Sequence, residues 1–251
     1  MGAKASAALG LDSARESSAL RIAGTKYAIG VCVAVRKLED YLRGMDLNVL
    51  LEPKVDLAHV ARILNELGPS GRLDTIRGWD RSQQAAIYEA AKGFSPLGLE
   101  HFVPKAVGPR IGVVHHGKST SIFNHFEKRI CRPDPLPDGS GVEELWGYTH
   151  NDWQVWTGPG YFVAYVAESP GEVALDHTRI PEGLAPAEGG PPDKPEGWPA
   201  VLPSSARLGR FIDDGTVDVM RGISKHVSIG RARRKTKWTD QWCVLCREDA
   251  D

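Results

Sequence analysis

The sequence of 251 residues is poor in cysteine and in net charge. Its four cysteines are too few for a disulfide framework in a chain of this length, so we expect a reducing compartment. Lys and Arg number 31 and Asp and Glu 32, which leaves a formal net charge of −1. A chain so balanced has no overall field that steers it onto nucleic acid or an anionic membrane, so any such binding needs a local patch.

Long hydrophobic runs are also missing. The longest one, 28–35, lies between Lys26 and Arg36 and is far shorter than the roughly 20 residues that a membrane-spanning helix needs. Asp12 and Glu16 precede this run, so we find no signal peptide. The sequence therefore predicts a cytoplasmic protein with no membrane segment, and it leaves export by a signal-independent route open.

The first 95 residues have the spacing of amphipathic helices. Apolar residues recur at helical intervals over Tyr27–Leu42. Asp56 is placed to cap a second helix, and Asp80 with Gln83 forms a capping box for a third. No catalytic pattern occurs here, so this part predicts helices that pack on the rest of the chain.

From Ser95 onward, Pro and Gly become frequent and the apolar runs shorten to strand length. The segment 181–203 holds seven prolines and four glycines, which predicts a surface loop. Two further runs, 121–130 and 217–223, have a helix-like pattern. Two predicted hairpins pair the remaining runs: 161–167 with 172–180, and 226–233 with 238–247.

These elements predict an α+β fold. A helical N-terminal part, residues 1–95, would pack against a mostly antiparallel sheet in a β-rich part, residues 96–251. The stretch 110–162 is the richest in chemistry, because it holds four of the eight histidines and three of the seven tryptophans.

Three motifs in this sequence have a structural explanation. Residues 112–119 match the P-loop pattern, but the Gly-Pro at 108–109 argues against the buried strand that a phosphate loop must follow. Cys243 and Cys246 lie three apart in a predicted strand, so their side chains would face opposite sides and not share a metal. The histidines show no metal-ligand spacing, and we expect no metal site among them: His115, His116, His125, His150 and His177.

A strand that ends in His116-Gly117 is followed by a helix-like run and later by Gly-Pro-Gly-Tyr-Phe at 158–162. In this order the stretch 110–248 resembles the core of ADP-ribosyltransferases of the diphtheria-toxin and poly-ADP-ribose-polymerase type. The resemblance implies NAD as a substrate, with ADP-ribosyl transfer or related glycosidic-bond chemistry as the activity.

The resemblance also implies roles for single residues. His116, followed by Gly117, would hold the NAD ribose, and the ring of Tyr161 would pack on the nicotinamide. Gln241 occupies the place of the family's catalytic glutamate, and Lys118 that of its threonine. An amide cannot supply the negative charge that stabilises an oxocarbenium-like transition state.

The alternative hypothesis is a non-enzymatic binding or assembly module. An aromatic loop would contact a protein partner through Trp146, Trp153 and Trp156. A basic hairpin would contact nucleic acid through Arg231, Arg233 and Arg234, beside Trp238. The sequence alone does not decide between this module and the enzyme.

Overall fold

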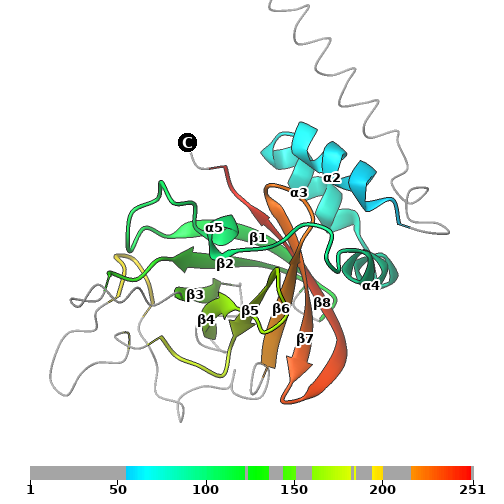
Figure 1. The fold of residues 1–251 in the computed structure, drawn as a ribbon. Coiled ribbons are helices and arrows are strands. Elements are labelled where there is room, and N and C mark those ends of the chain that lie inside the picture. Colours follow the sequence, from blue (N-terminus) through cyan, green and yellow to red (C-terminus); the bar gives the residue numbers. More distant parts are fainter. Residues whose placement is uncertain are drawn as a thin grey trace, which may run out of the picture. The chain divides into compact units, whose positions relative to one another are not determined.

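Eight antiparallel strands that close into a barrel dominate the computed structural model (Figure 1). Each strand pairs with its neighbours in sequence, and β8 returns to pair with β1. The strands are β1 (Val113–Ser119), β2 (His125–Cys131), β3 (Glu144–His150), β4 (Gly160–Val166), β5 (Glu172–Asp176), β6 (Thr216–Gly222), β7 (Val227–Arg234) and β8 (Lys237–Arg247).

The structure describes residues 55–121, 124–135, 144–150, 160–181, 184, 194–199 and 216–249. All of them belong to one compact unit, Asn48–Asp251. The predicted helix over Tyr27–Leu42 lies outside the described residues.

The predicted α+β class is wrong, because the architecture is mostly β. Two of the errors have the same cause. The helix-like run 121–130 covers β2 except for its last residue, and the run 217–223 is covered almost entirely by β6. Both strands turn a charged side chain, Lys128 or Asp218, toward the barrel interior. The alternation of apolar and polar residues that marks a half-buried strand is therefore broken.

Both predicted hairpins are present. Strands β4 and β5 form the first hairpin, and Gly171 in its turn has a φ of 75°, which glycine adopts without strain. Strands β7 and β8 form the second one, with Arg234 paired to Lys237 at its tip.

In the described residues, four helices precede the barrel: α2 (Leu57–Glu66), α3 (Pro69–Gly78), α4 (Arg81–Ala90) and the short α5 (Leu99–Phe102). The predicted caps are confirmed. The Asp56 side chain accepts the His59 N–H at 3.0 Å, and Asp80 and Gln83 form the reciprocal capping box of α4. Among the described residues, no helix has the length and apolar character to cross a membrane.

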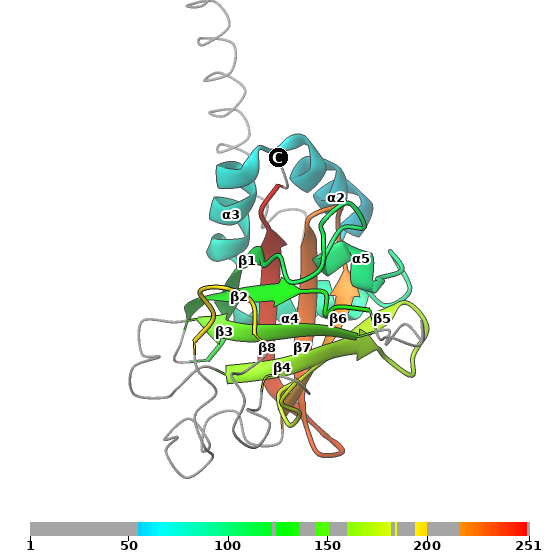
Figure 2. The ribbon, with the colours of Figure 1, turned by 90° about the vertical axis from the view of Figure 1, so that its left-hand side faces the viewer.

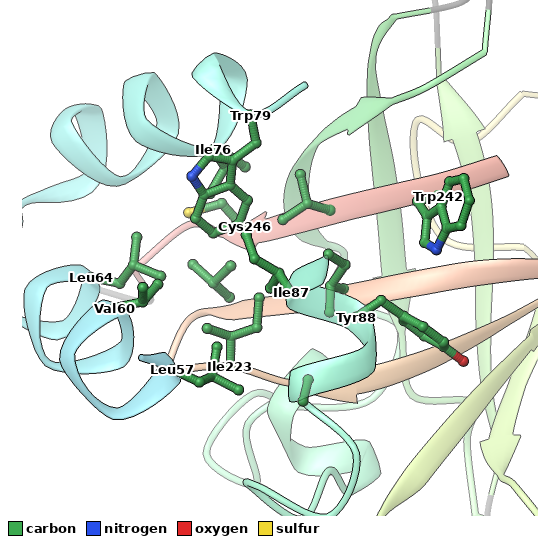
Figure 3. Close-up of a cluster of buried hydrophobic side chains, with 14 residues drawn as sticks. Leu57, Val60, Leu64, Ile76, Trp79, Ile87, Tyr88, Ile223, Trp242 and Cys246 are labelled. Atoms are coloured by element: carbon green, nitrogen blue, oxygen red, sulfur yellow. The ribbon is translucent and has the colours of Figure 1, made fainter. Parts of the chain in front are cut away.

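Strand β8 separates two hydrophobic cores. Its outward side chains, Trp242, Val244 and Cys246, pack against α2, α3 and α4 (Figure 3). Its inward side chains, Cys243 and Leu245, belong to the core inside the barrel. Helix α3 lies beside β1 and β8, and α4 lies beside β7 and β8 (Figure 2). Because alternate side chains of β8 enter the two cores, this one strand connects the helices to the barrel.

Segment 95–103 closes one end of the barrel. Phe102 and Val103 belong to the inner core, and Phe102 stacks on His115 of β1. At the same end, Leu97 donates its N–H to the carbonyl of Gly171. The tip of the β7–β8 hairpin lies at the opposite end, because antiparallel strands alternate in direction around the barrel.

Candidate functional sites

His116 lies on the outer wall of the barrel, on β1. Its Nε2 is 2.6 Å from Oε1 of Glu248, and its Nδ1 is 3.7 Å from Oε1 of Glu127. Glu127 lies on β2 and Glu248 directly follows β8, the two strands that pair with β1. The sequence does not place either carboxylate beside His116. The imidazole is therefore held by acidic side chains at a partly exposed surface.

Tyr161 also lies on the outer wall, but on β4. Its ring packs among those of Tyr148 and Trp198, with centroid separations of 5.8 and 6.2 Å. Its hydroxyl donates to the carbonyl of Pro199, and only 2% of the residue is exposed. Tyr161 is thus a packed and hydrogen-bonded component of a small aromatic core.

The structure does not bring the predicted site residues together. Strands β2 and β3 lie between His116 and Tyr161, which corresponds to about 14 Å along the wall. Gln241 is exposed, and it lies on β8 about 17 Å along the strand from Cys246, the residue opposite His116. Gly117 faces the interior, where a Cβ would lie 2.4 Å from the ring of Phe126. This geometry does not support a shared nicotinamide site.

The structure places the residues of the other three motifs on the barrel strands or directly beside them. The P-loop-like residues form β1 itself, so no phosphate loop is present at that place. Cys243 faces the barrel interior and Cys246 faces the helices, as predicted. His115 is buried inside, whereas its neighbour His116 faces out. Within the described part of the chain, no group of three or more His, Cys, Asp or Glu side chains is arranged to hold a metal ion.

Arginine side chains and indole rings alternate on the outer face of the β7–β8 hairpin. The guanidinium carbon of Arg231 is 5.1 Å from the ring centroid of Trp242 and 5.6 Å from that of Trp238. The guanidinium carbon of Arg233 is 6.0 Å from the Trp238 centroid. Trp238 is 47% exposed, so its ring is accessible although two cations hold it.

The charges of this hairpin are only partly balanced. Arg231 pairs with Glu89 at 3.7 Å and with Asp240 at 3.5 Å. Within the described ranges, the other four cations of the segment have no carboxylate within 4.0 Å: Arg233, Arg234, Lys235 and Lys237. We call residues 231–238 the basic hairpin.

The predicted aromatic loop is described only in part. Trp146 on β3 is half-buried and packs against the cluster that contains Tyr148, Tyr161 and Trp198. Trp153 and Trp156 lie outside the described residues. Trp146 is therefore partly occupied in packing, and a partner site on the rest of this loop stays a prediction.

The interior of the barrel contains a charged group that the sequence did not reveal. The Lys128 ammonium lies 3.0 Å from Nε2 of His177, 3.3 Å from Oγ1 of Thr149 and 3.6 Å from Oδ2 of Asp218. It also lies 4.6 Å from the ring centroid of Phe162. The residue is 3% exposed, so this cation is almost fully removed from water.

Asp218 remains ionised in this environment. Burial alone would raise the pKa of its carboxyl group, but the hydrogen bond from His177 and the charge of Lys128 lower it below its usual value. Lys128 comes from β2, His177 follows β5 and Asp218 comes from β6. Lys128 meets the other two only across the barrel interior, so no spacing in the sequence could have predicted the group.

No protein family, curated protein or solved structure matches this chain. The resemblance to ADP-ribosyltransferases therefore stays a prediction.

Proposed function

We propose that the protein is a binding module for single-stranded nucleic acid and that the basic hairpin is its contact surface. The observation that carries this proposal is Trp238, a 47% exposed indole held by two guanidinium groups at a cationic hairpin tip. This corresponds to the binding-module hypothesis and not to the enzyme hypothesis.

The ring of Trp238 is suited to base stacking. Exposed aromatic surface is unfavourable in water, and a nucleobase covers it with another flat π-surface. Arg231 and Arg233 reduce the rotational freedom of the indole before any ligand arrives. Less conformational entropy is then lost on binding.

The charge of the hairpin favours a polyanion. The segment 231–238 contains five Lys and Arg residues and no Asp or Glu, in a chain whose formal net charge is −1. The positive potential of such a cluster attracts phosphates locally, even though the net charge of the whole protein is close to zero. Regular spacing of phosphates along an unpaired strand lets several of these cations act at once while a base reaches Trp238.

The test is fluorescence anisotropy of the full chain with a labelled single-stranded oligonucleotide, in DNA and RNA form, over a series of salt concentrations. We expect the logarithm of the binding constant to fall with the logarithm of salt by about 0.7 for each phosphate contacted. Trp238→Ala should weaken binding about tenfold, since stacking contributes about 1–3 kcal/mol per base. Arg233→Glu with Arg234→Glu should abolish it.

The matched control is Arg62→Glu with Lys105→Glu, which changes the net charge equally at exposed positions of other elements. It should bind as the wild type does. An equal loss of oligonucleotide affinity in this control would mean that the net charge of the protein, and not the basic hairpin, determines binding. Binding to anionic vesicles or to polyglutamate, with none to oligonucleotides, would replace the proposal by a membrane or an acidic protein as partner.

A further inference from the structure

The inner wall of the barrel has an unbalanced charge. Two cations, Lys128 and Arg247, project from inward-facing strand positions and are 3% and 7% exposed. Asp218 is the one carboxylate at an inward-facing position of the described strands. Because Asp218 lies 3.6 Å from Lys128, it neutralises that cation, and Arg247 is left over. A buried charge without a counterion is strongly unfavourable.

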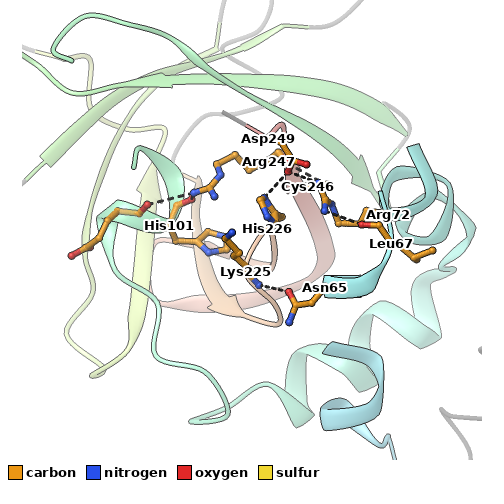
Figure 4. Close-up of polar contacts among 10 residues, drawn as sticks. Asn65, Leu67, Arg72, His101, Lys225, His226, Cys246, Arg247 and Asp249 are labelled. Carbon is orange, nitrogen blue, oxygen red and sulfur yellow. Dashed lines mark hydrogen bonds and ion pairs between the residues drawn. The ribbon is translucent and has the colours of Figure 1, made fainter. Parts of the chain in front are cut away.

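The hydrogen bonds of Arg247 to other described residues go to neutral groups, and the charge of Asp249 acts on its guanidinium from beyond ion-pair distance. Its Nη1 donates to the carbonyl of His101 at 2.6 Å and lies 3.5 Å from that of Glu100, both in α5 (Figure 4). In the described part of the chain, no carboxylate lies within 4.0 Å of its guanidinium nitrogens, and its buried Nε has no hydrogen-bond partner. Nearby Asp249 instead pairs with Arg72 and with His226 at 3.0 Å.

His115 is the neighbour of Arg247 in the barrel wall. Its register partner on β8 is Arg247, and its register partner on β2 is Lys128, so the three residues form one row across three adjacent strands. His115 is 1% exposed, and neither of its ring nitrogens has a hydrogen-bond partner among the residues that the structure describes. An unsatisfied buried imidazole is rare, because each orphaned polar group reduces stability.

The protonation state of His115 makes it a donor as well as an acceptor. Burial, together with the positive charges of His101 (when protonated), Arg247 and Lys128, keeps its pKa well below the usual value. The neutral ring therefore carries one N–H and one free lone pair. A ligand with an anionic oxygen could accept from this N–H and from Nε of Arg247.

We propose that the row Arg247–His115–Lys128 binds a small oxyanion inside the barrel, namely the carboxylate of a small organic acid. The carboxylate supplies the missing negative charge and satisfies the orphaned donors of Arg247 and His115. The adjoining inward side chains are apolar, among them Ile130, Phe162 and Leu245. Such walls suit an acid with a short apolar body better than the fully hydrated phosphate ion.

The position of Phe102 has a consequence for ligand entry. This ring stacks on His115 with a centroid separation of 5.6 Å, and α5 is bonded to Arg247. Entry from this end therefore requires α5 to move, so association should be slower than the usual rate for a preformed site.

The test uses the full chain, purified and extensively dialysed, with acetate, butanoate, benzoate and inorganic phosphate as separate probes at constant ionic strength. Imidazole resonances observed by NMR, together with the melting temperature, report binding. We expect butanoate or benzoate to shift the His115 resonances and to raise the melting temperature by several degrees at saturation. Phosphate should do neither.

Two variants and one control decide the assignment. His115→Leu keeps the bonds between Arg247 and α5, and it should weaken carboxylate binding at least tenfold. Arg247→Met should abolish binding, and its circular dichroism spectrum shows whether it has folded. Arg129→Met removes a cation from the outer face of the same strand as Lys128 and should bind as the wild type does.

Other outcomes would overturn the proposal. Unchanged His115 resonances with every probe would mean that water alone occupies the orphaned groups. Full carboxylate affinity in folded His115→Leu would place the ligand elsewhere. Binding of phosphate in preference to every carboxylate would replace the ligand class. These results are independent of the basic hairpin, because none of the three substituted residues belongs to it.

Discussion

His115 shows how the fold controls a single titratable residue. In the unfolded chain a histidine titrates near pH 6.5, but in the fold the pKa of His115 lies well below that value because the ring is buried near cations. Burial also lowers the pKa of His101 to about 3. On acidification the unfolded state therefore binds protons before the folded state does, and stability is lost.

We predict that the free energy of unfolding decreases as the pH falls from about 6.5, by up to about 1.4 kcal/mol per pH unit for each such histidine. Urea unfolding at a series of pH values measures this slope. His115→Leu should make it shallower, whereas His150→Leu, at an exposed position, should leave it nearly unchanged. An identical slope in His115→Leu would show that His115 is not kept neutral.

For single residues, the sequence correctly predicted which side of a strand a side chain faces, but it did not predict which side chains from distant strands come into contact. It predicted that His115 and His116 face opposite sides and that Cys243 and Cys246 do the same, because the period of two is local. It did not find Lys128 beside Asp218, because their strands are separated in the chain and meet only across a closed barrel. The predicted trio of His116, Tyr161 and Gln241 is dispersed for the same reason.

Among the elements, β3 shows how closely one inward position packs against the neighbouring strand. Gly147 faces inward, and a Cβ there would lie 2.3 Å from Cζ of Phe162 on β4. The absence of a side chain at this position thus leaves room for the ring of its cross-strand neighbour.

We predict that Gly147→Ala destabilises the protein by about 1–3 kcal/mol, the range for overpacked cores, in a chemical denaturation experiment. Gly78→Ala at the end of α3, where nothing lies within 4 Å, is the control and should be neutral or slightly stabilising. Adding Phe162→Leu to Gly147→Ala should cost less than Phe162→Leu costs alone. Strict additivity of the two changes would contradict the proposed clash.

Element prediction succeeded where the signal was local and failed where tertiary structure decided. The caps at Asp56 and Asp80 and both hairpins were found, since turn and cap chemistry is contained in a few residues. Strands β2 and β6 were interpreted as helical, since an inward Lys128 or Asp218 breaks the strand pattern. Closure into a barrel leaves no trace in any single segment.

For the whole molecule, the two cores on either side of β8 should make the helices and the barrel unfold as one unit. Ile87 of α4 is fully buried and belongs to the same cluster as Ile229 of β7 and Val244 of β8. Loss of this contact therefore weakens both parts at once.

We predict that Ile87→Ala reduces the free energy of unfolding by about 2–5 kcal/mol. Far-UV circular dichroism and tryptophan fluorescence should report the same midpoint, since one cooperative transition involves both parts. Val166→Ala, at a 49% exposed position, should have little effect. Two separate midpoints in the Ile87→Ala variant would show that the helices unfold independently of the barrel.

The pairing of β8 with β1 has a consequence for the order of events during synthesis. The other pairs of the barrel join strands that leave the ribosome one after the other, whereas the β1–β8 pair must wait until β8, the last of the eight strands, has emerged. Until then the nascent sheet has two bare edges, and such edges readily pair with other chains. A chaperone that shields the free edge of β1 during translation would thus prevent it from pairing with other chains before β8 arrives.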